Sequence, residues 1–218
     1  MKTPSPVMFE ISPSEQLNSL LAESGLDPLP PDLSASFEQY LHLLLHWNTR
    51  LNLTAIRNPE AILSRHFMES IVCARALPTG LSSLMDLGSG AGFPGIPIAL
   101  CRPEIAVTLA ESQGKKAAFL REAIRTLAIS ATVHAARAES LTARFDCVTL
   151  RAVDSMELAV QTAGPLVTPN GWLAIMTSAA ELPKLKAAAG PSFSWQDPTL
   201  LPLSVDRFLV LGKHIVSE

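Results

Sequence analysis

No uninterrupted apolar run in the 218 residues approaches the roughly 18 that a membrane-spanning helix needs. Residues 1–16 hold one lysine and no apolar stretch, so we expect no secretory signal. Internal repeats and low-complexity tracts are also missing. With 48% hydrophobic and 17% charged residues, the chain can bury a core, which excludes a disordered protein. The length allows one large domain, or one domain with a small appendage.

Cysteine is scarce, and its positions form no recognisable framework. The three residues Cys73, Cys101 and Cys147 lie in apolar surroundings without CxxC spacing. An odd number with this spacing argues against both a disulfide framework and a zinc site. We therefore expect no bound metal, and we interpret the cysteines as buried thiols of a cytoplasmic protein.

Charge is unevenly distributed along the chain. The formal net charge is −3, yet residues 46–151 carry twelve Lys/Arg against eight Asp/Glu, and both flanking regions are net acidic. Nucleic-acid binding needs a local basic surface and does not need a protein that is basic overall. The basic middle region is therefore compatible with an RNA partner, and also with ordinary solvated arginines. The first candidates for RNA contact are Arg50, Arg57, Arg65, Lys115 and Lys116.

The spacing of apolar residues changes near residue 80. Before that point apolar residues recur at helical spacing, and Asn58 followed by Pro59 predicts a capped helix start. From Ser83 onward, short apolar runs typical of strands alternate with helical patterns. This alternation predicts an α/β fold with a doubly wound, mostly parallel sheet and an antiparallel edge. We expect a helical N-terminal extension over residues 1–80 and the α/β domain over residues 81–218.

The stretch DLGSGAGFPGIP, Asp86–Pro97, contains glycine at positions 88, 90, 92 and 95. Because glycine loses the most conformational freedom on folding, this density indicates a ligand lying against bare backbone, or else a tight turn. The GxGxxG pattern of dinucleotide sites fails from Gly88, where Phe93 replaces the third glycine, but fits from Gly90. S-adenosylmethionine suits the loop better, because the helix end then receives only a carboxylate and Asp86 closes the preceding strand.

Three further strand ends carry candidate binding residues. Glu111 ends the second predicted strand, where a carboxylate can accept from ribose hydroxyls, or can simply be solvated. Ala138 and Glu139 follow the third strand and can address the amino edge of an adenine. Arg151 ends the fourth strand, where it can bind a methionine carboxylate, a phosphate or the target, or act only as a cap.

Six segments match one family in order and at suitable spacing. They are WNTRLNLTAIRNP, RHFMESI, DLGSGAGFPGIPIAL, ESQGKKAAFLRE, ARAES and LRAV, which together extend from Trp47 to Val153. On these segments the chain resembles the ribosomal RNA small subunit methyltransferase G family, also called glucose-inhibited division protein B. The family often has a lysine-glycine pair after the next strand, where this chain has Met176 and Thr177. No substrate contact is therefore assigned to that loop.

The resemblance implies a class I S-adenosylmethionine-dependent methyltransferase fold with a helical N-terminal extension. The implied reaction transfers a methyl group from S-adenosylmethionine to N7 of a guanine in the decoding region of 16S ribosomal RNA. The implied partner is this RNA, within the small ribosomal subunit or an assembly intermediate, and we expect a monomer without membrane association. Family positions that bind the cofactor correspond here to Gly88, Phe93, Ala138, Glu139 and Arg151.

Guanine N7 has no proton to lose, so its methylation needs alignment and exclusion of water more than a base. The sequence agrees, because LRAV stands where amino-group methyltransferases have (D/N)PP(Y/F), and no Pro-Cys nucleophile is present. We therefore assign no catalytic residue. We expect His66 to make an RNA or structural contact and Trp47 to lie in the core. If Arg151 touches the base, it must leave N7 free, which excludes a bidentate contact to O6 and N7.

Three other functions stay open on the sequence alone. One is a methyltransferase for another RNA site, and one is a nicotinamide-dependent oxidoreductase, which Phe93 and Asp86 disfavour. The third is a ribosome-associated binding module without a cofactor. The presence of the glycine loop together with Glu111 and Arg151 disfavours this third function.

Overall fold

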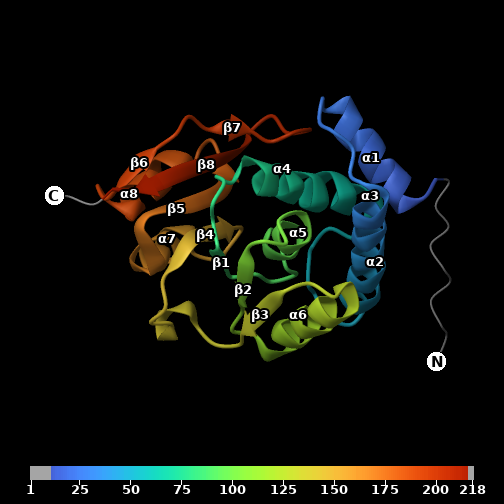
Figure 1. Ribbon diagram of the computed structural model, residues 1–218, viewed down its shortest axis with the longest axis horizontal. Coiled ribbons are helices and arrows are strands. Elements are labelled where there is room, and N and C mark those ends of the chain that lie inside the picture. Colours follow the sequence, from blue (N-terminus) through green and yellow to red (C-terminus); the bar gives the residue numbers. More distant parts are fainter. Residues whose placement is uncertain (1–10, 216–218) are drawn as a thin grey trace.

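Helices surround an eight-stranded sheet in the computed structural model, which describes residues 11–215 (Figure 1). The α-helices are α1 (Pro13–Glu23), α2 (Pro31–Asn48), α3 (Pro59–Ile62), α4 (Met68–Ala76), α5 (Gly95–Cys101), α6 (Gly114–Leu127), α7 (Met156–Ala163) and α8 (Leu182–Ala189). A π-helical turn, η1 (Leu63–Phe67), joins α3 to α4, and η2 (Ala138–Ser140) and η3 (Gly164–Leu166) are 3-10 turns. The strands are β1 (Ser83–Leu87), β2 (Ala106–Ala110), β3 (Ala131–His134), β4 (Phe145–Arg151), β5 (Val167–Ser178), β6 (Phe193–Trp195), β7 (Thr199–Leu200) and β8 (Arg207–His214).

The strand order is β3-β2-β1-β4-β5-β8-β6, with β7 paired to β8. Strands β1 to β5 run parallel, while β8 runs antiparallel to β5, β6 and β7. The chain leaves β1 toward β2 and later returns to its other side as β4, so the order reverses between β1 and β4. In such sheets ligands bind beyond the carboxyl ends of the strands at this reversal. The expected α/β fold with a mostly parallel sheet and an antiparallel edge is confirmed.

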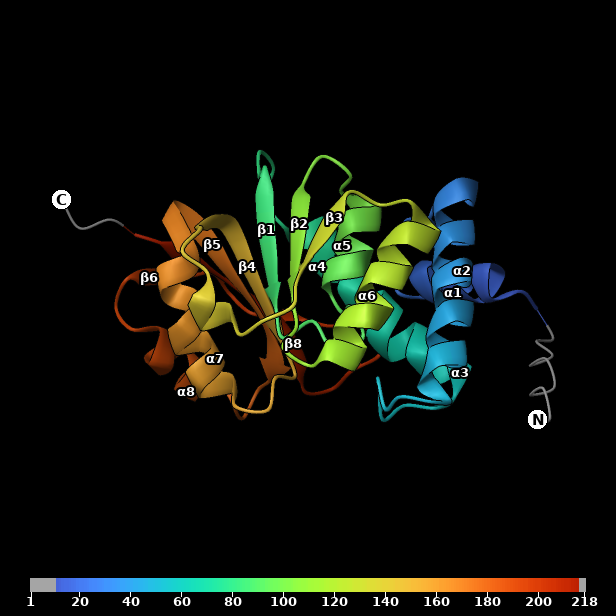
Figure 2. The ribbon, with the colours of Figure 1, turned by 90° about the horizontal axis from the view of Figure 1, so that it is seen from below.

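Both faces of the sheet are covered, because successive side chains of a strand point to opposite faces. Along β1, Leu84 packs into the apolar cluster that holds the helices α1 to α6, whereas Met85 packs into the cluster under α7 and α8. Figures 1 and 2 show the same separation of α5 and α6 from α7 across the sheet. The edge formed by the carboxyl ends of the strands is thus where loops from both faces meet.

The N-terminal helices share a core with the sheet. Tyr40 of α2 is fully buried, and its hydroxyl donates to the backbone oxygen of Ala91 at 2.5 Å, 51 residues away. Its ring stacks on Phe67 and packs against Phe93, with ring centroids 5.2 and 5.3 Å apart. As expected, Trp47 packs inward, edge-on to a phenylalanine of α6. The contacts of Tyr40 hold α2 against the glycine-rich loop, and the contact of Trp47 holds it against α6.

The expected capped helix start at Asn58 and Pro59 is confirmed. The side chain of Asn58 accepts a hydrogen bond from the Ala61 N–H, and Pro59 is the first residue of α3. The inward-facing apolar residues after this start are all buried: Ile62, Phe67, Ile71 and Ala74. Among the described residues, no helix is long and apolar enough to cross a membrane. The three cysteines are free thiols, two of them buried.

Candidate active site

The carboxylate of Asp86 supports the glycine-rich loop through a hydrogen bond from Gly95. Asp86 is the second-to-last residue of β1, 1% exposed, and its carboxylate accepts from Gly95 N–H at 3.2 Å and from the Thr149 hydroxyl at 2.9 Å. Burial raises its pKa to about 6, against the hydrogen bonds that lower it. Asp86 therefore ties the start of α5 to β4 and does not face a ligand.

Two glycines of the loop have backbone conformations that other residues rarely adopt. Gly88 has φ +74°, and a Cβ there would lie 2.8 Å from a methyl of Val153. Gly90 has φ +55°, and a Cβ there would meet only the Gly88 oxygen, at 3.8 Å. A side chain at position 90 would therefore project into open space that the loop encloses, as expected if a ligand lies there.

Glu111 links the end of β2 to this loop. It is 7% exposed, and its carboxylate accepts from Gly90 N–H at 3.0 Å and from Gln113 N–H at 2.7 Å. A carboxylate offers about four lone-pair positions, so Glu111 can accept further hydrogen bonds from a ligand. The sequence-based candidate is thus buried, oriented and only partly satisfied.

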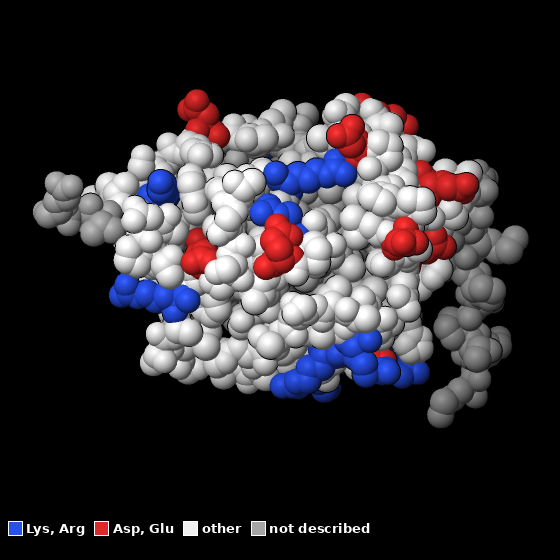
Figure 3. Space-filling model, viewed as in Figure 1, with Lys and Arg blue, Asp and Glu red and all other residues white. Residues whose placement is uncertain are grey.

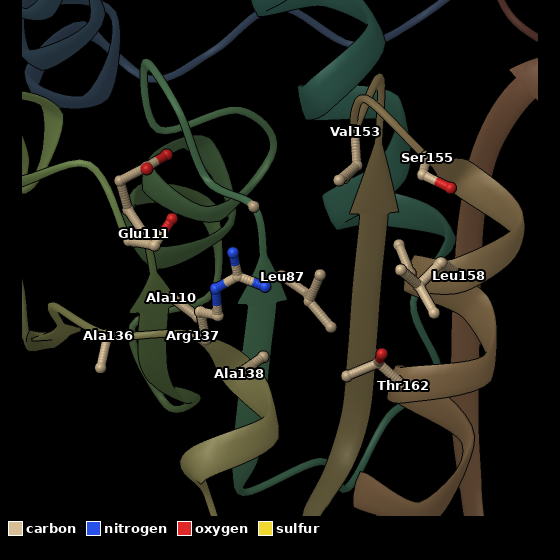
Figure 4. A pocket seen from close by; sticks show the side chains of 13 residues that line it. Leu87, Ala110, Glu111, Ala136, Arg137, Ala138, Val153, Ser155, Leu158 and Thr162 are labelled. Carbon is tan, nitrogen blue, oxygen red and sulfur yellow. The ribbon is translucent and has the colours of Figure 1, made fainter.

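Three cavities follow one another along the carboxyl edge of the sheet. The first, about 200 Å³, contains Gly88, Glu111 and Ala138, and Figure 4 shows Glu111 on one side with Leu158 and Thr162 of α7 on the other. The second, about 580 Å³, shares Gly88 and Glu111 with the first. The second also contains Thr54, His66, Gly90, Phe93, Lys116 and Arg151.

The third cavity, about 380 Å³, lies on the other side of Arg151, and it shares His66 and Arg151 with the second. It is also lined by Glu69, Met176 and Arg207. The expected binding residues Gly88, Phe93, Glu111, Ala138 and Arg151 therefore line the first two cavities. The side chain of Glu139, another expected contact, lies outside the described part of the structure; its backbone belongs to η2.

Arg151 is the last residue of β4 and is held by three acceptors. Its Nη2 lies 2.9 Å from the Arg65 backbone oxygen, 2.8 Å from His66 Nδ1 and 3.1 Å from Glu69 Oε2. Its Nη1 is buried and has no hydrogen-bond partner within residues 11–215. A buried donor without a partner is costly, so this nitrogen is free to bind a ligand oxygen.

Glu69 supplies the negative charge that pairs with two arginines around the third cavity. It is 1% exposed and forms ion pairs with both Arg151 and Arg207, the latter with Nε at 2.6 Å. Reasoning from the sequence missed Glu69, although it lies in the matched segment RHFMESI. No sequence signal marked Arg207, because it lies 138 residues from Glu69 along the chain.

His66 is half-buried and neutral. Burial, followed by the nearby Arg151, Arg65 and Arg207, lowers its pKa to about 3. Its ring stacks on Phe93 with centroids 4.8 Å apart, and both ring nitrogens contact protein groups. The structure therefore gives His66 a structural contact.

The residues expected to contact RNA differ in exposure. Arg50, Arg57, Arg65 and Lys115 are exposed, whereas Lys116 is half-buried and lines the second cavity. Arg57 also holds its own segment, through the Asn48 oxygen at 2.7 Å. In Figure 3 a group of Lys and Arg lies along the lower edge, where Figure 1 places α6, and acidic side chains gather near α1 and α2. No group of three or more His, Cys, Asp or Glu suited to a metal ion occurs in the described residues.

The family model for rRNA small subunit methyltransferase G, named GidB, matches residues 33–193. The chain belongs to this family. It is 41% identical over 191 residues to the ribosomal RNA small subunit methyltransferase G of Xanthomonas campestris, covering 86% of each chain. The protein of the same name from Stenotrophomonas maltophilia is 41% identical over 200 residues, covering 90% of each chain.

Solved structures show the same fold. A predicted O-methyltransferase of Agrobacterium tumefaciens superposes with a TM-score of 0.58 at 23% identity, over 67% of this chain and 81% of that one. The TYW2 protein of M. jannaschii, solved in complex with AdoMet, superposes with a TM-score of 0.56 at 14% identity, over 70% of this chain and 78% of that one. The expected family and the class I methyltransferase fold are thereby confirmed.

Proposed function

We propose that the protein transfers a methyl group from S-adenosylmethionine to N7 of a guanine in 16S ribosomal RNA. Family membership supports methylation of ribosomal RNA. The site is assigned mainly from the position of Glu111. Its partly satisfied carboxylate lies where the first and second cavities meet. In this proposal residues 1–80 are the helical extension, and residues 81–218 are the methyltransferase domain.

The residues present fit this cofactor. The free acceptor positions of Glu111 suit ribose hydroxyls, and the backbone around Ala138 and Glu139 suits the adenine edge in the first cavity. The loop at Gly88, Gly90 and Phe93 would surround the methionine part in the second cavity. The unpaired Nη1 of Arg151 suits the methionine carboxylate. When bound, the cofactor supplies an electrophilic methyl group on a sulfonium.

The chain itself would align the two reactants and exclude water. Guanine N7 carries no proton at neutral pH, so no group needs to remove one. The side chains around the second cavity agree, because His66 is neutral with both nitrogens engaged and Asp86 is buried behind the loop. Alignment by Arg151, Phe93 and the loop is then the main contribution of the protein.

The proposed substrate is the small ribosomal subunit or an assembly intermediate, and the enzyme acts as a monomer in the cytoplasm. The small basic excess of residues 46–151 is too modest to hold free RNA tightly, which favours a folded subunit. The proposed position in the RNA lies in the decoding region, as the sequence resemblance implies. A methyltransferase for another RNA site is the alternative.

Two measurements test this function. In a strain that lacks the gene, mapping of 7-methylguanine in 16S ribosomal RNA is expected to show the loss of one modified guanine, restored by the wild-type gene. Calorimetry on the purified protein is expected to show binding of S-adenosylmethionine and not of NAD. An unchanged 7-methylguanine pattern would overturn the proposed reaction, and binding of NAD instead would favour the oxidoreductase.

A further inference from the structure

Thr54 lines the second cavity, in the segment between α2 and α3. Its Oγ1 is 2.7 Å from His66 Nε2 and 3.1 Å from the backbone nitrogen of Ile56. The direction of each of these hydrogen bonds decides what the hydroxyl can offer to a molecule in the cavity.

The direction of the His66 contact follows from Arg151. A guanidinium has only donors, so His66 Nδ1, 2.8 Å from Arg151 Nη2, must accept. The same arginines and the burial that lower the His66 pKa to about 3 keep the ring neutral. A neutral ring that accepts at Nδ1 carries its proton on Nε2. Nε2 therefore donates to Thr54 Oγ1.

Thr54 Oγ1 thus accepts twice, from His66 Nε2 and from the N–H of Ile56. A hydroxyl oxygen has two acceptor positions and one proton to donate. Both acceptor positions are occupied by groups that can only donate, and the hydroxyl proton has no acceptor within residues 11–215. Toward the cavity, Thr54 is therefore a donor and cannot act as an acceptor.

We propose that Thr54 selects guanine over adenine by donating its hydroxyl proton to O6 of the target base. This inference rests on the proposed function and deepens it. Both purines present N7 to a methyl donor, but guanine carries the acceptor O6 at the neighbouring position where adenine carries an amino group. A hydroxyl that can only donate bonds to O6 and meets the adenine amino group donor to donor.

A single hydroxyl also satisfies the constraint that methylation places on the site. A bidentate arginine contact to O6 and N7 would occupy the atom that reacts. One donor at O6 leaves the N7 lone pair free. Thr54 shares its cavity with Gly90, Phe93 and Arg151, the residues proposed to surround the reacting end of the cofactor. Selection at O6 therefore occurs in the cavity where transfer would take place.

The test compares Thr54→Val, which removes the hydroxyl, with Thr54→Ser, which keeps it. The substrates are small ribosomal subunits that carry guanine, 2-aminopurine or adenine at the mapped target, and single-turnover methylation is measured. 2-Aminopurine keeps N7 but lacks O6. Because one hydrogen bond is at stake, Thr54→Val should slow methylation of guanine by about five- to tenfold and leave 2-aminopurine unchanged. Its preference for guanine over adenine should fall at least as much, and Thr54→Ser should resemble the wild type.

Cofactor affinity, measured by calorimetry, serves as the folding control. If Thr54→Val no longer binds the cofactor, Thr54→Ala is measured in its place, because a water molecule can then accept from His66 and Ile56. Equal slowing of guanine and 2-aminopurine would show a purely structural role for Thr54, and unchanged rates on guanine would show no contact. Either result overturns the inference while leaving the proposed function intact. A wild-type enzyme that does not methylate guanine N7 would overturn both.

Discussion

Glu111 accepts a hydrogen bond from the Gly90 N–H at 3.0 Å, which joins the end of β2 to the glycine-rich loop after β1. This contact helps to hold the loop, and together with the hydrogen bond from Gln113 N–H it orients the carboxylate. In the proposed cofactor site this contact places a ribose acceptor beside bare backbone. Substitution of either residue should weaken binding of the cofactor more than binding of the RNA.

Glu111→Ala should weaken binding of S-adenosylmethionine by about 1.5–3 kcal/mol, the range for hydrogen bonds to a charged group. Calorimetry measures the affinity, and circular dichroism checks the fold. The matched control is Glu122→Ala, which removes a carboxylate of α6 that pairs with Arg125 and lies outside the three cavities. Unchanged affinity in a folded Glu111→Ala protein would remove Glu111 from the site.

Gly90→Val should abolish cofactor binding, because its side chain would project into the second cavity. Its φ of +55° also strains any other residue there, at a cost of about 1–2 kcal/mol in the free energy of unfolding. Gly25→Val separates the two effects, since Gly25 has φ +71° and a Cβ at that position would meet no atom within 4 Å. Both variants should lose similar stability in urea titrations, but only Gly90→Val should lose affinity. Loss of affinity in Gly25→Val as well would mean that strain alone explains the result.

Lys115→Ala combined with Lys116→Ala should reduce the salt dependence of RNA binding. Each neutralised phosphate contact contributes to the slope of log affinity against log salt, so the slope should fall by up to about two units. Cofactor affinity should stay the same. Lys184→Ala with Lys186→Ala is the control, because both lysines belong to α8 in the net acidic carboxyl-terminal region. An unaltered slope in the Lys115 and Lys116 double variant would place the RNA footprint elsewhere.

Asp86 should make stability depend on pH. Its pKa is about 6 in the folded protein against an ordinary value of 3.8, so the folded state holds this proton more tightly than the unfolded state. The stability that this protonation contributes is fully present below pH 3.8 and is lost as pH rises through about 6. The free energy of unfolding then decreases by about 3 kcal/mol. Urea denaturation of the wild type and of Asp86→Asn at several pH values isolates this contribution, because the variant lacks the titrating group. Parallel stability curves for the two proteins would contradict the assignment.

Methyl transfer itself should be nearly independent of pH from about pH 6 to pH 9, where an ordinary histidine would begin to titrate. N7 has no proton to lose, and His66, with its pKa of about 3, stays neutral throughout this range. The measurement is single-turnover methylation with saturating cofactor and saturating ribosomal subunits. A tenfold rise in rate per pH unit would show that a proton leaves the target, and an exocyclic amine or hydroxyl would then replace N7 as the target.

The sequence by itself determined the features that depend on local physics. Apolar spacing indicated the alternating strands and helices, because helices and half-buried strands need different periods. The glycines marked the loop, because Gly88 and Gly90 require positive φ that other residues avoid. Glu111 could be found because the carboxyl ends of neighbouring parallel strands meet at one edge of the sheet.

Only the tertiary structure decided how charge and protons are arranged around Arg151. Glu69 lies 82 residues before Arg151 and 138 before Arg207, and only the return of the chain through β4 and β8 brings the three together. Burial and the nearby Arg151, Arg65 and Arg207 keep His66 neutral. The contact with Arg151 fixes the nitrogen that carries the His66 proton, which in turn orients the hydroxyl of Thr54. Such states depend on burial and on partners distant in sequence, so no local pattern can encode them.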